Sequence, residues 1–121
     1  MKRSLLLSTL VFLCLSCSKP LPELKGYDQS IWKDDYKGCK MSRGIFLESL
    51  RAQRDQLKGL SEKDIVTLLG RPDRNDLSKR HEKFYYYFIA PGPGCEGVDS
   101  VGLSLIVRFN ATGVSREIAI E

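Results

Sequence analysis

The clearest pattern of apolar and polar positions lies in residues 61–73. Three apolar residues recur there at the spacing of one helical face, a serine precedes them, and glycine and proline follow. Serine suits the N-cap, with an acidic residue three positions on to complete a capping box. The glycine and the proline end the helix. So short a helix needs a surface to pack on. These residues are Ser61, Asp64, Ile65, Leu68, Leu69, Gly70 and Pro72.

A second helix is predicted over Ser42–Gln56, because apolar residues there form one stripe. A turn at Lys58 and Gly59 would join the two helices into a helical hairpin. The preceding segment, residues 27–41, predicts an irregular or short helical stretch that leans on the core. Its Trp32 is either a structural residue or a binding anchor, and the structural role is the more common for a lone tryptophan in a small domain. The stripe consists of Ile45, Phe46, Leu50 and Leu57.

Three strands are predicted in the C-terminal half, over residues 84–89, 101–109 and 114–120. In the first strand Phe84, Tyr86 and Phe88 share one face, and Tyr85, Tyr87 and Ile89 share the other. In the second, Leu103, Leu105, Val107 and Phe109 alternate inward. The predicted fold class is therefore α+β: a helical hairpin packed on a three-stranded antiparallel β-meander, in two layers.

Residues 73–83, between the helix and the first strand, are polar and of mixed charge. One interpretation is a patch for anionic lipid head groups, built from Arg71, Arg74, Lys79, Arg80 and Lys83. The other is a solvated connection. Acidic residues alternate with the basic ones, which favours the connection.

The N-terminus has the pattern of a bacterial lipoprotein signal. Basic Lys2 and Arg3 precede an apolar run that is too short to span a bilayer. The segment ends Leu15-Ser16-Cys17, which resembles a lipobox with a small residue before the cysteine, although Cys14 stands where a leucine is usual. The alternative is an ordinary secretory signal. We predict a signal peptide over residues 1–16, acylation of Cys17, a tether over 17–26 and one domain over 27–121.

Charge argues against a nucleic-acid partner. The formal net charge of the 121-residue chain is +4, and loss of Lys2 and Arg3 with the signal lowers it to +2. A nucleic-acid-binding domain needs a larger basic footprint. The expected contact with a membrane is the lipid anchor at Cys17, whose acyl chains make attachment close to permanent.

Two cysteines remain after the signal and the anchor, Cys39 and Cys95, in an exported and oxidising setting. This favours a disulfide. A zinc site would have to join them to His81, the only histidine, and no ligand spacing typical of zinc sites supports it. No cofactor, metal or small-molecule substrate is expected, and neither is catalysis, because His81 lies in a polar connection without a nucleophile elbow nearby.

From Ser61 onward the chain resembles the SmpA/OmlA family, small outer-membrane lipoproteins of the BamE type. The resemblance covers residues 61–120. It rests on Leu69-Gly70-Arg71-Pro72, on the tyrosines of 85–87 and on the strand and turn of 105–114. It implies a BamE-like fold and a non-catalytic accessory role in outer-membrane assembly or maintenance. Related modules that bind and inhibit secreted enzymes are similar to the same degree, and this is the alternative function.

A protein-binding role requires a surface, and the sequence offers two. One is an open face of the sheet with Tyr85, Tyr87, Ile106 and Arg108, since interfaces favour aromatic residues and arginine. The competing interpretation is that residues 27–41 cover this face. The second surface is the loop from Ala90 to Ser100, which a disulfide at Cys95 would pre-organise. The expected partner is another protein of the bacterial envelope.

Overall fold

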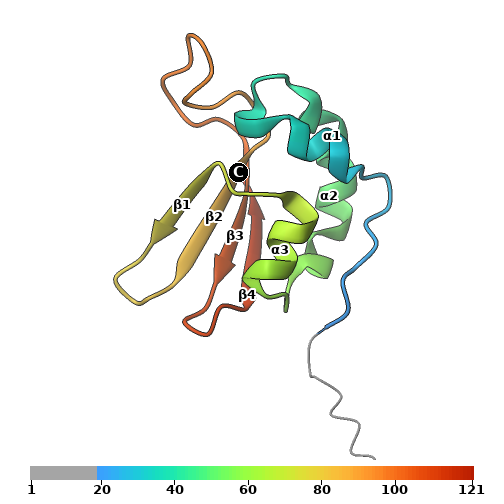
Figure 1. Ribbon diagram of the computed structural model, residues 1–121, viewed down its shortest axis with the longest axis vertical. Coiled ribbons are helices and arrows are strands. Elements are labelled where there is room, and N and C mark those ends of the chain that lie inside the picture. Colours follow the sequence, from blue (N-terminus) through green and yellow to red (C-terminus); the bar gives the residue numbers. More distant parts are fainter. Residues whose placement is uncertain (1–18) are drawn as a thin grey trace, which may run out of the picture.

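The computed structural model describes residues 19–121, a four-stranded antiparallel sheet with helices on one of its faces (Figure 1). The predicted signal peptide and Cys17 lie outside the described residues. The α-helices are α1 (Gln29–Asp34), α2 (Leu47–Gln53) and α3 (Glu62–Leu69). Short 3₁₀ helices are η1 (Tyr36–Gly38), η2 (Ser42–Phe46) and η3 (Arg54–Leu57). The strands are β1 (Arg74–Leu77), β2 (Lys83–Phe88), β3 (Ser104–Phe109) and β4 (Ser115–Ile120), in that spatial order.

The α+β class agrees with the prediction, but the three-stranded meander on a helical hairpin was wrong. The sheet has a fourth strand, β1, in the segment interpreted as a solvated connection. β1 is a polar edge strand that pairs with β2 through backbone hydrogen bonds. Its sequence lacks the alternation of apolar and polar residues by which a strand is recognised. The helical layer also holds α1, and the helix predicted over Ser42–Gln56 is split into η2, α2 and η3. Ile45, expected in its apolar stripe, is 70% exposed.

Helix α3 has the boundaries that its sequence predicts. The Ser61 side chain accepts a hydrogen bond from the Asp64 backbone N–H at 3.1 Å. At the other end Gly70 has a φ of 80°, which favours glycine, and its N–H closes the last turn on the Val66 carbonyl. The apolar face of Ile65, Leu68 and Leu69 is buried against the sheet.

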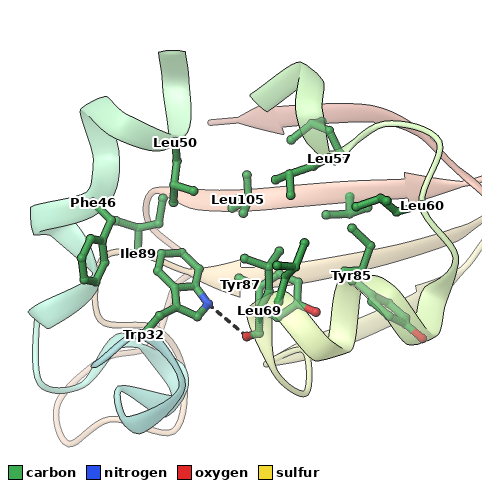
Figure 2. Close-up of a cluster of buried hydrophobic side chains, with 14 of the residues drawn as sticks. Trp32, Phe46, Leu50, Leu57, Leu60, Leu69, Tyr85, Tyr87, Ile89 and Leu105 are labelled. Atoms are coloured by element: carbon green, nitrogen blue, oxygen red, sulfur yellow. Dashed lines mark hydrogen bonds between the residues drawn. The ribbon is translucent and has the colours of Figure 1, made fainter. Parts of the chain in front are cut away.

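The C-terminal end of α3 is enclosed by side chains that donate to its carbonyls. Trp32 Nε1 donates to the Leu69 carbonyl at 3.0 Å (Figure 2). The Tyr87 hydroxyl donates to the Gly70 carbonyl at 2.9 Å. Tyr27 donates to Leu68 and Lys33 to Thr67. The last four carbonyls of a helix have no intrahelical partner, so these contacts meet a need that burial would otherwise leave unmet. Trp32 is fully buried in the core, which confirms its structural role.

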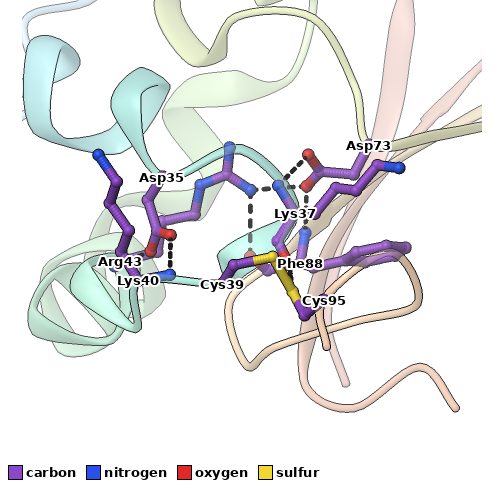
Figure 3. The surroundings of a disulfide bond; sticks show 8 residues. All are labelled: Asp35, Lys37, Cys39, Lys40, Arg43, Asp73, Phe88 and Cys95. Carbon is purple, nitrogen blue, oxygen red and sulfur yellow. Dashed lines mark hydrogen bonds and ion pairs between the residues drawn. A yellow bond between two sulfur atoms is a disulfide. The ribbon is translucent and has the colours of Figure 1, made fainter. Parts of the chain in front are cut away.

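The disulfide predicted between Cys39 and Cys95 is present, with Cα atoms 5.4 Å apart (Figure 3). It joins the segment after η1 to the long loop between β2 and β3. Its 56-residue separation corresponds to about 4 kcal/mol of stabilisation in the chain-entropy account. The loop is therefore fixed to the helical layer at its midpoint.

Beside the disulfide lies a buried ion pair. Arg43 Nη1 is 2.6 Å from Asp73 Oδ2, and both side chains are at most 1% exposed. The Asp73 carboxylate also accepts the backbone N–H groups of Lys37 and Phe88 (Figure 3). Arg43 donates further to the Trp32 and Phe88 carbonyls. The pair therefore joins the helical layer, the α3–β1 connection and the end of β2.

We expect Tyr87→Phe to lower the free energy of unfolding by about 0.5–1.5 kcal/mol, because the partly buried Gly70 carbonyl loses its donor. Tyr86→Phe is the matched control, since the Tyr86 hydroxyl forms no hydrogen bond within residues 19–121, and it should change stability little. Urea denaturation of both variants measures this. Equal losses in the two variants would contradict the capping role of Tyr87.

We expect Asp73→Asn to cost about 3–5 kcal/mol, because it leaves the charge of Arg43 buried without a counter-charge. Asp76→Asn removes a carboxylate from an exposed pair with Arg74 and should cost no more than about 1 kcal/mol. Chemical denaturation of the two variants measures these losses, and the m-values should stay the same as in the wild type. A loss for Asp73→Asn as small as that of the control would show that the pair is dispensable.

Candidate functional site: the open face of the sheet

The candidate site is the sheet face opposite the helices, and strand register builds it as two rows. In the first row Tyr86 lies opposite Ile106, and Ile106 opposite Ala119. The second row pairs Phe84 with Arg108 and Arg108 with Glu117. Strand β1 extends both rows, because Arg74 lies opposite Tyr86 and Asp76 opposite Phe84. We define the open face by these eight residues: Arg74, Asp76, Phe84, Tyr86, Ile106, Arg108, Glu117 and Ala119.

The open face has an apolar centre with charged groups around it. A shallow hollow of about 120 Å³ lies over the centre, lined by six of the eight residues and by Glu121. This is too small for an ordinary cofactor or drug-sized ligand, which occupies several hundred Å³, but it can receive one apolar side chain. No element of residues 19–121 packs over it. Residues 27–41, which could have covered this face, lie on the opposite side, where Trp32 packs near Tyr87.

Both arginines of the open face are already oriented. The Arg74 guanidinium carbon lies 4.9 Å from the centre of the Tyr86 ring, and the same group binds Asp76 at 2.8 Å. Arg108 contacts Glu117 at 3.2 Å and Glu82 at 3.5 Å, and its side chain is 29% exposed. These ion pairs are exposed or half-buried, so each stabilises the fold little. Their effect is to limit the rotamers of the arginines that a partner would contact.

The structure divides the four residues predicted for the binding face. Ile106 and Arg108 lie on the open face. Tyr85 and Tyr87 do not: they are 8% and 0% exposed and pack in the core with Leu105 and Val107. The alternation within β2 was predicted correctly, but its inward face was assigned wrongly. Tyr86 takes the place expected of the two tyrosines.

Sequence reasoning missed Phe84 and Tyr86 for one reason. Every position of β2 from 84 to 88 is aromatic, so hydrophobicity does not distinguish its two faces. The signal that could have found them is the strand pairing. Once Leu105 and Val107 are assigned inward, antiparallel register places Tyr86 beside the outward Ile106.

The two inward tyrosines have raised pKa values. Burial, followed by the hydrogen bond to Glu62 and its charge, raises the pKa of Tyr85 to about 12. Burial is also the main cause of the raised pKa of Tyr87. Burial opposes ionisation of Glu62 as well, but hydrogen bonds from Tyr85 and Lys83 outweigh it and lower the pKa of that carboxyl. This arrangement connects α3 to the sheet and lies outside the open face.

The second candidate surface is the loop from Ala90 to Ser100, which projects from the end of the sheet (Figure 1). Besides the disulfide, the Gly92 N–H donates to the Lys37 carbonyl at 3.1 Å. Glu96 and Asp99 are exposed near its tip. The loop is therefore attached at Gly92 and at Cys95, and it presents acidic side chains outward.

The only histidine of the sequence, His81, lies outside the open face. His81 is exposed in the β1–β2 turn, where it lines a polar hollow with Glu62 and Lys83. Among residues 19–121 no cluster of three or more histidine, cysteine or acidic side chains could hold a metal ion. Within the same residues, no helix has the length and apolar character needed to cross a bilayer.

Comparisons of the chain with protein-family models, curated proteins and solved structures found no match. The resemblance to the SmpA/OmlA family stays a prediction from sequence.

The tyrosine pKa values predict how stability depends on pH. Below about pH 10 the phenols are protonated in both states, and their contribution is fully present. Above about pH 10 the unfolded phenols ionise while Tyr85 and Tyr87 stay protonated in the fold, so the free energy of unfolding falls as pH rises. Each tyrosine adds up to about 1.4 kcal/mol per pH unit to this slope.

Urea titrations at several pH values between about 8 and 11 test this dependence. The double variant Tyr85→Phe/Tyr87→Phe should show a shallower slope, whereas Tyr36→Phe, an exposed tyrosine outside the core, should keep the wild-type slope. An unchanged slope in the double variant would refute the assignment.

Proposed function

We propose that this protein is a lipid-anchored component of the bacterial envelope, at the outer membrane, that binds another envelope protein through its open face. Its role is that of a non-catalytic scaffold or accessory in outer-membrane assembly or maintenance. The anchor rests on the sequence of residues 1–17, and the accessory role on the resemblance over residues 61–120. The observation that supports binding is the apolar centre of the open face, which no described segment covers.

The composition of the open face suits a protein partner. Aromatic residues and arginine are the residues that interfaces favour, and binding energy concentrates in apolar anchors surrounded by polar groups. Tyr86 and Ile106 form such a centre, and Arg74 and Arg108 flank it. Since the ion pairs already restrict both arginines, a partner would lose little side-chain entropy in ordering them. The partner we expect inserts one apolar side chain into the hollow between the rows.

The loop from Ala90 to Ser100 favours a second candidate function, an inhibitory module for a periplasmic or secreted enzyme. A projecting loop fixed by a disulfide enters a partner's cleft at a low cost in conformational entropy. The two candidates differ in the surface they use, so variants in each surface separate them.

The test is a mild-crosslinking pull-down of the full-length lipoprotein from its own membranes, with mass spectrometry of the eluate. Tyr86→Ala should reduce recovery of the partner at least tenfold, the effect of losing a central contact worth about 1.4 kcal/mol or more. Tyr36→Ala is the matched control, because this half-exposed tyrosine lies outside the open face, and it should recover the partner normally. Melting temperatures should confirm that both variants are folded.

The eluate also identifies the function. Components of outer-membrane β-barrel assembly would support the accessory role. A single secreted enzyme, lost with Glu96→Ala/Asp99→Ala and retained with Tyr86→Ala, would support the inhibitory module instead. Unchanged recovery with Tyr86→Ala would refute binding through the open face.

A further inference from the structure

The segment expected to be an extended tether lies along the domain. Lys19 Nζ donates to the carbonyls of Gln56 and Lys58, both at 2.7 Å. Six residues later the backbone of Lys25 exchanges two hydrogen bonds with the Gln53 side chain. Leu24 is partly buried against the core. Residues 19–26 are therefore bound to α2 and η3, and the described chain begins at the η3 end of the domain (Figure 1).

This attachment sets how far the domain can lie from a lipid on Cys17. Two residue steps separate Cys17 from Lys19, and they span at most about 7 Å at 3.3–3.6 Å per residue. A free tether over the whole of 18–26 would have allowed about 30 Å. If Cys17 carries acyl chains, as the proposed function holds, the η3 end lies in or against the head-group layer.

Several turns and chain segments meet at that end of the molecule. The Gly59 backbone bonds that of Ser115 at 2.8 Å, which places the start of β4 beside η3. The turn of residues 110–113 borders the same polar hollow as His81, which places the β1–β2 turn next to it. Figure 1 shows both hairpin turns at the end where the described chain begins, and the disulfide-bonded loop at the opposite end.

The exposed side chains at this end are mainly basic. Arg54, Lys79, Arg80 and Arg116 are exposed and form no ion pair within residues 19–121. Of the nearby carboxylates, Asp55 is bound to Lys58 at 3.0 Å, Glu62 to Lys83 at 3.0 Å and Glu82 to Arg108 at 3.5 Å. Asp64 is half-buried at the start of α3, and Glu23 is exposed in the attached segment. We define the basic end as six exposed residues: Lys19, Arg54, Lys58, Lys79, Arg80 and Arg116.

We propose that the basic end docks on the anionic head groups of the membrane that holds the lipid anchor. Attraction between a basic residue and an anionic bilayer acts only within a Debye length, about 8 Å at physiological salt. The span of about 7 Å from Cys17 to Lys19 brings the η3 side of the basic end inside that range. The two hairpin turns lie at the same end of the molecule, so they face the bilayer when this end does (Figure 1). Docking fixes the orientation of the domain: the loop from Ala90 to Ser100 points away from the bilayer, and the open face stands beside it, accessible to a protein in the same membrane.

The inference rests on the proposed anchor and is tested with the full-length acylated lipoprotein in two kinds of vesicle. One is phosphatidylcholine alone, and the other contains phosphatidylglycerol as the anionic lipid. Hydrogen–deuterium exchange by mass spectrometry reports on residues 54–59 and 78–82 at the basic end and on 91–100 in the distal loop. We expect exchange at the basic end to be several-fold slower in anionic vesicles and to recover at high salt, with the loop unchanged.

Charge reversal provides the matched variants. Lys79→Glu/Arg80→Glu should abolish the protection that depends on anionic lipid. Lys40→Glu/Arg71→Glu changes the net charge equally at exposed positions of the segment after η1 and of the α3–β1 connection, and should keep the protection. Equal exchange in both vesicles, or equal loss in both variants, would overturn the docking proposal.

The intact mass of the protein separates the two possible failures. An acylated protein without charge-dependent protection would refute docking and leave the anchored function standing. A protein without acyl chains on Cys17 would refute both the anchor and the docking that depends on it.

Discussion

The fold depends on how the C-terminal end of α3 is enclosed. Four successive carbonyls, from Thr67 to Gly70, each accept a hydrogen bond from a side chain distant in sequence. The donors are Tyr27, Trp32 and Lys33 from the N-terminal segment and Tyr87 from β2. The bond to Leu69 is buried, those to Leu68 and Gly70 are partly buried, and that to Thr67 is exposed. A buried carbonyl without a partner costs about 1–3 kcal/mol, so the Leu69 end of the helix can enter the core only if Trp32 packs against it. The contacts thereby set the position of α1, α3 and the sheet relative to one another.

The need for a hydrogen-bond partner also explains why β2 turns Tyr85 and Tyr87 inward. A phenol in the core needs an acceptor, and α3 provides two, the Gly70 carbonyl for Tyr87 and the Glu62 carboxylate for Tyr85. Both acceptors lie more than fifteen residues before their donors, so no local pattern reveals them. Sequence alone favours neither face of an all-aromatic strand. The inward face of β2 is decided by tertiary contacts, and this is why the binding face was assigned to Tyr85 and Tyr87 in error.

Most features that the sequence predicts correctly depend on residues close together in the chain. The ends of α3 follow from Ser61 and Gly70, which act within one turn, and β3 follows from a clean alternation that placed Ile106 and Arg108 correctly. Counting cysteines in a chain predicted to be exported was enough for the Cys39–Cys95 disulfide. Strand β1 could not be found this way, because Arg74 to Leu77 pair through the backbone and bury almost nothing. Tyr86 was missed because its place depends on register with β3.

The ion pair of Arg43 and Asp73 fixes the end of the sheet next to the disulfide-bonded loop. It lies at the end of the sheet opposite the basic end, where it fixes the Phe88 backbone just before the disulfide-bonded loop. A buried pair is weak evidence of net stability, but removal of either partner is costly, so it favours one arrangement over alternatives. Here that arrangement sets the direction in which the loop leaves the sheet. If the basic end docks on a bilayer as we propose, the open face has a constant orientation toward neighbouring membrane proteins, and a single apolar anchor would bind there at a low entropic cost.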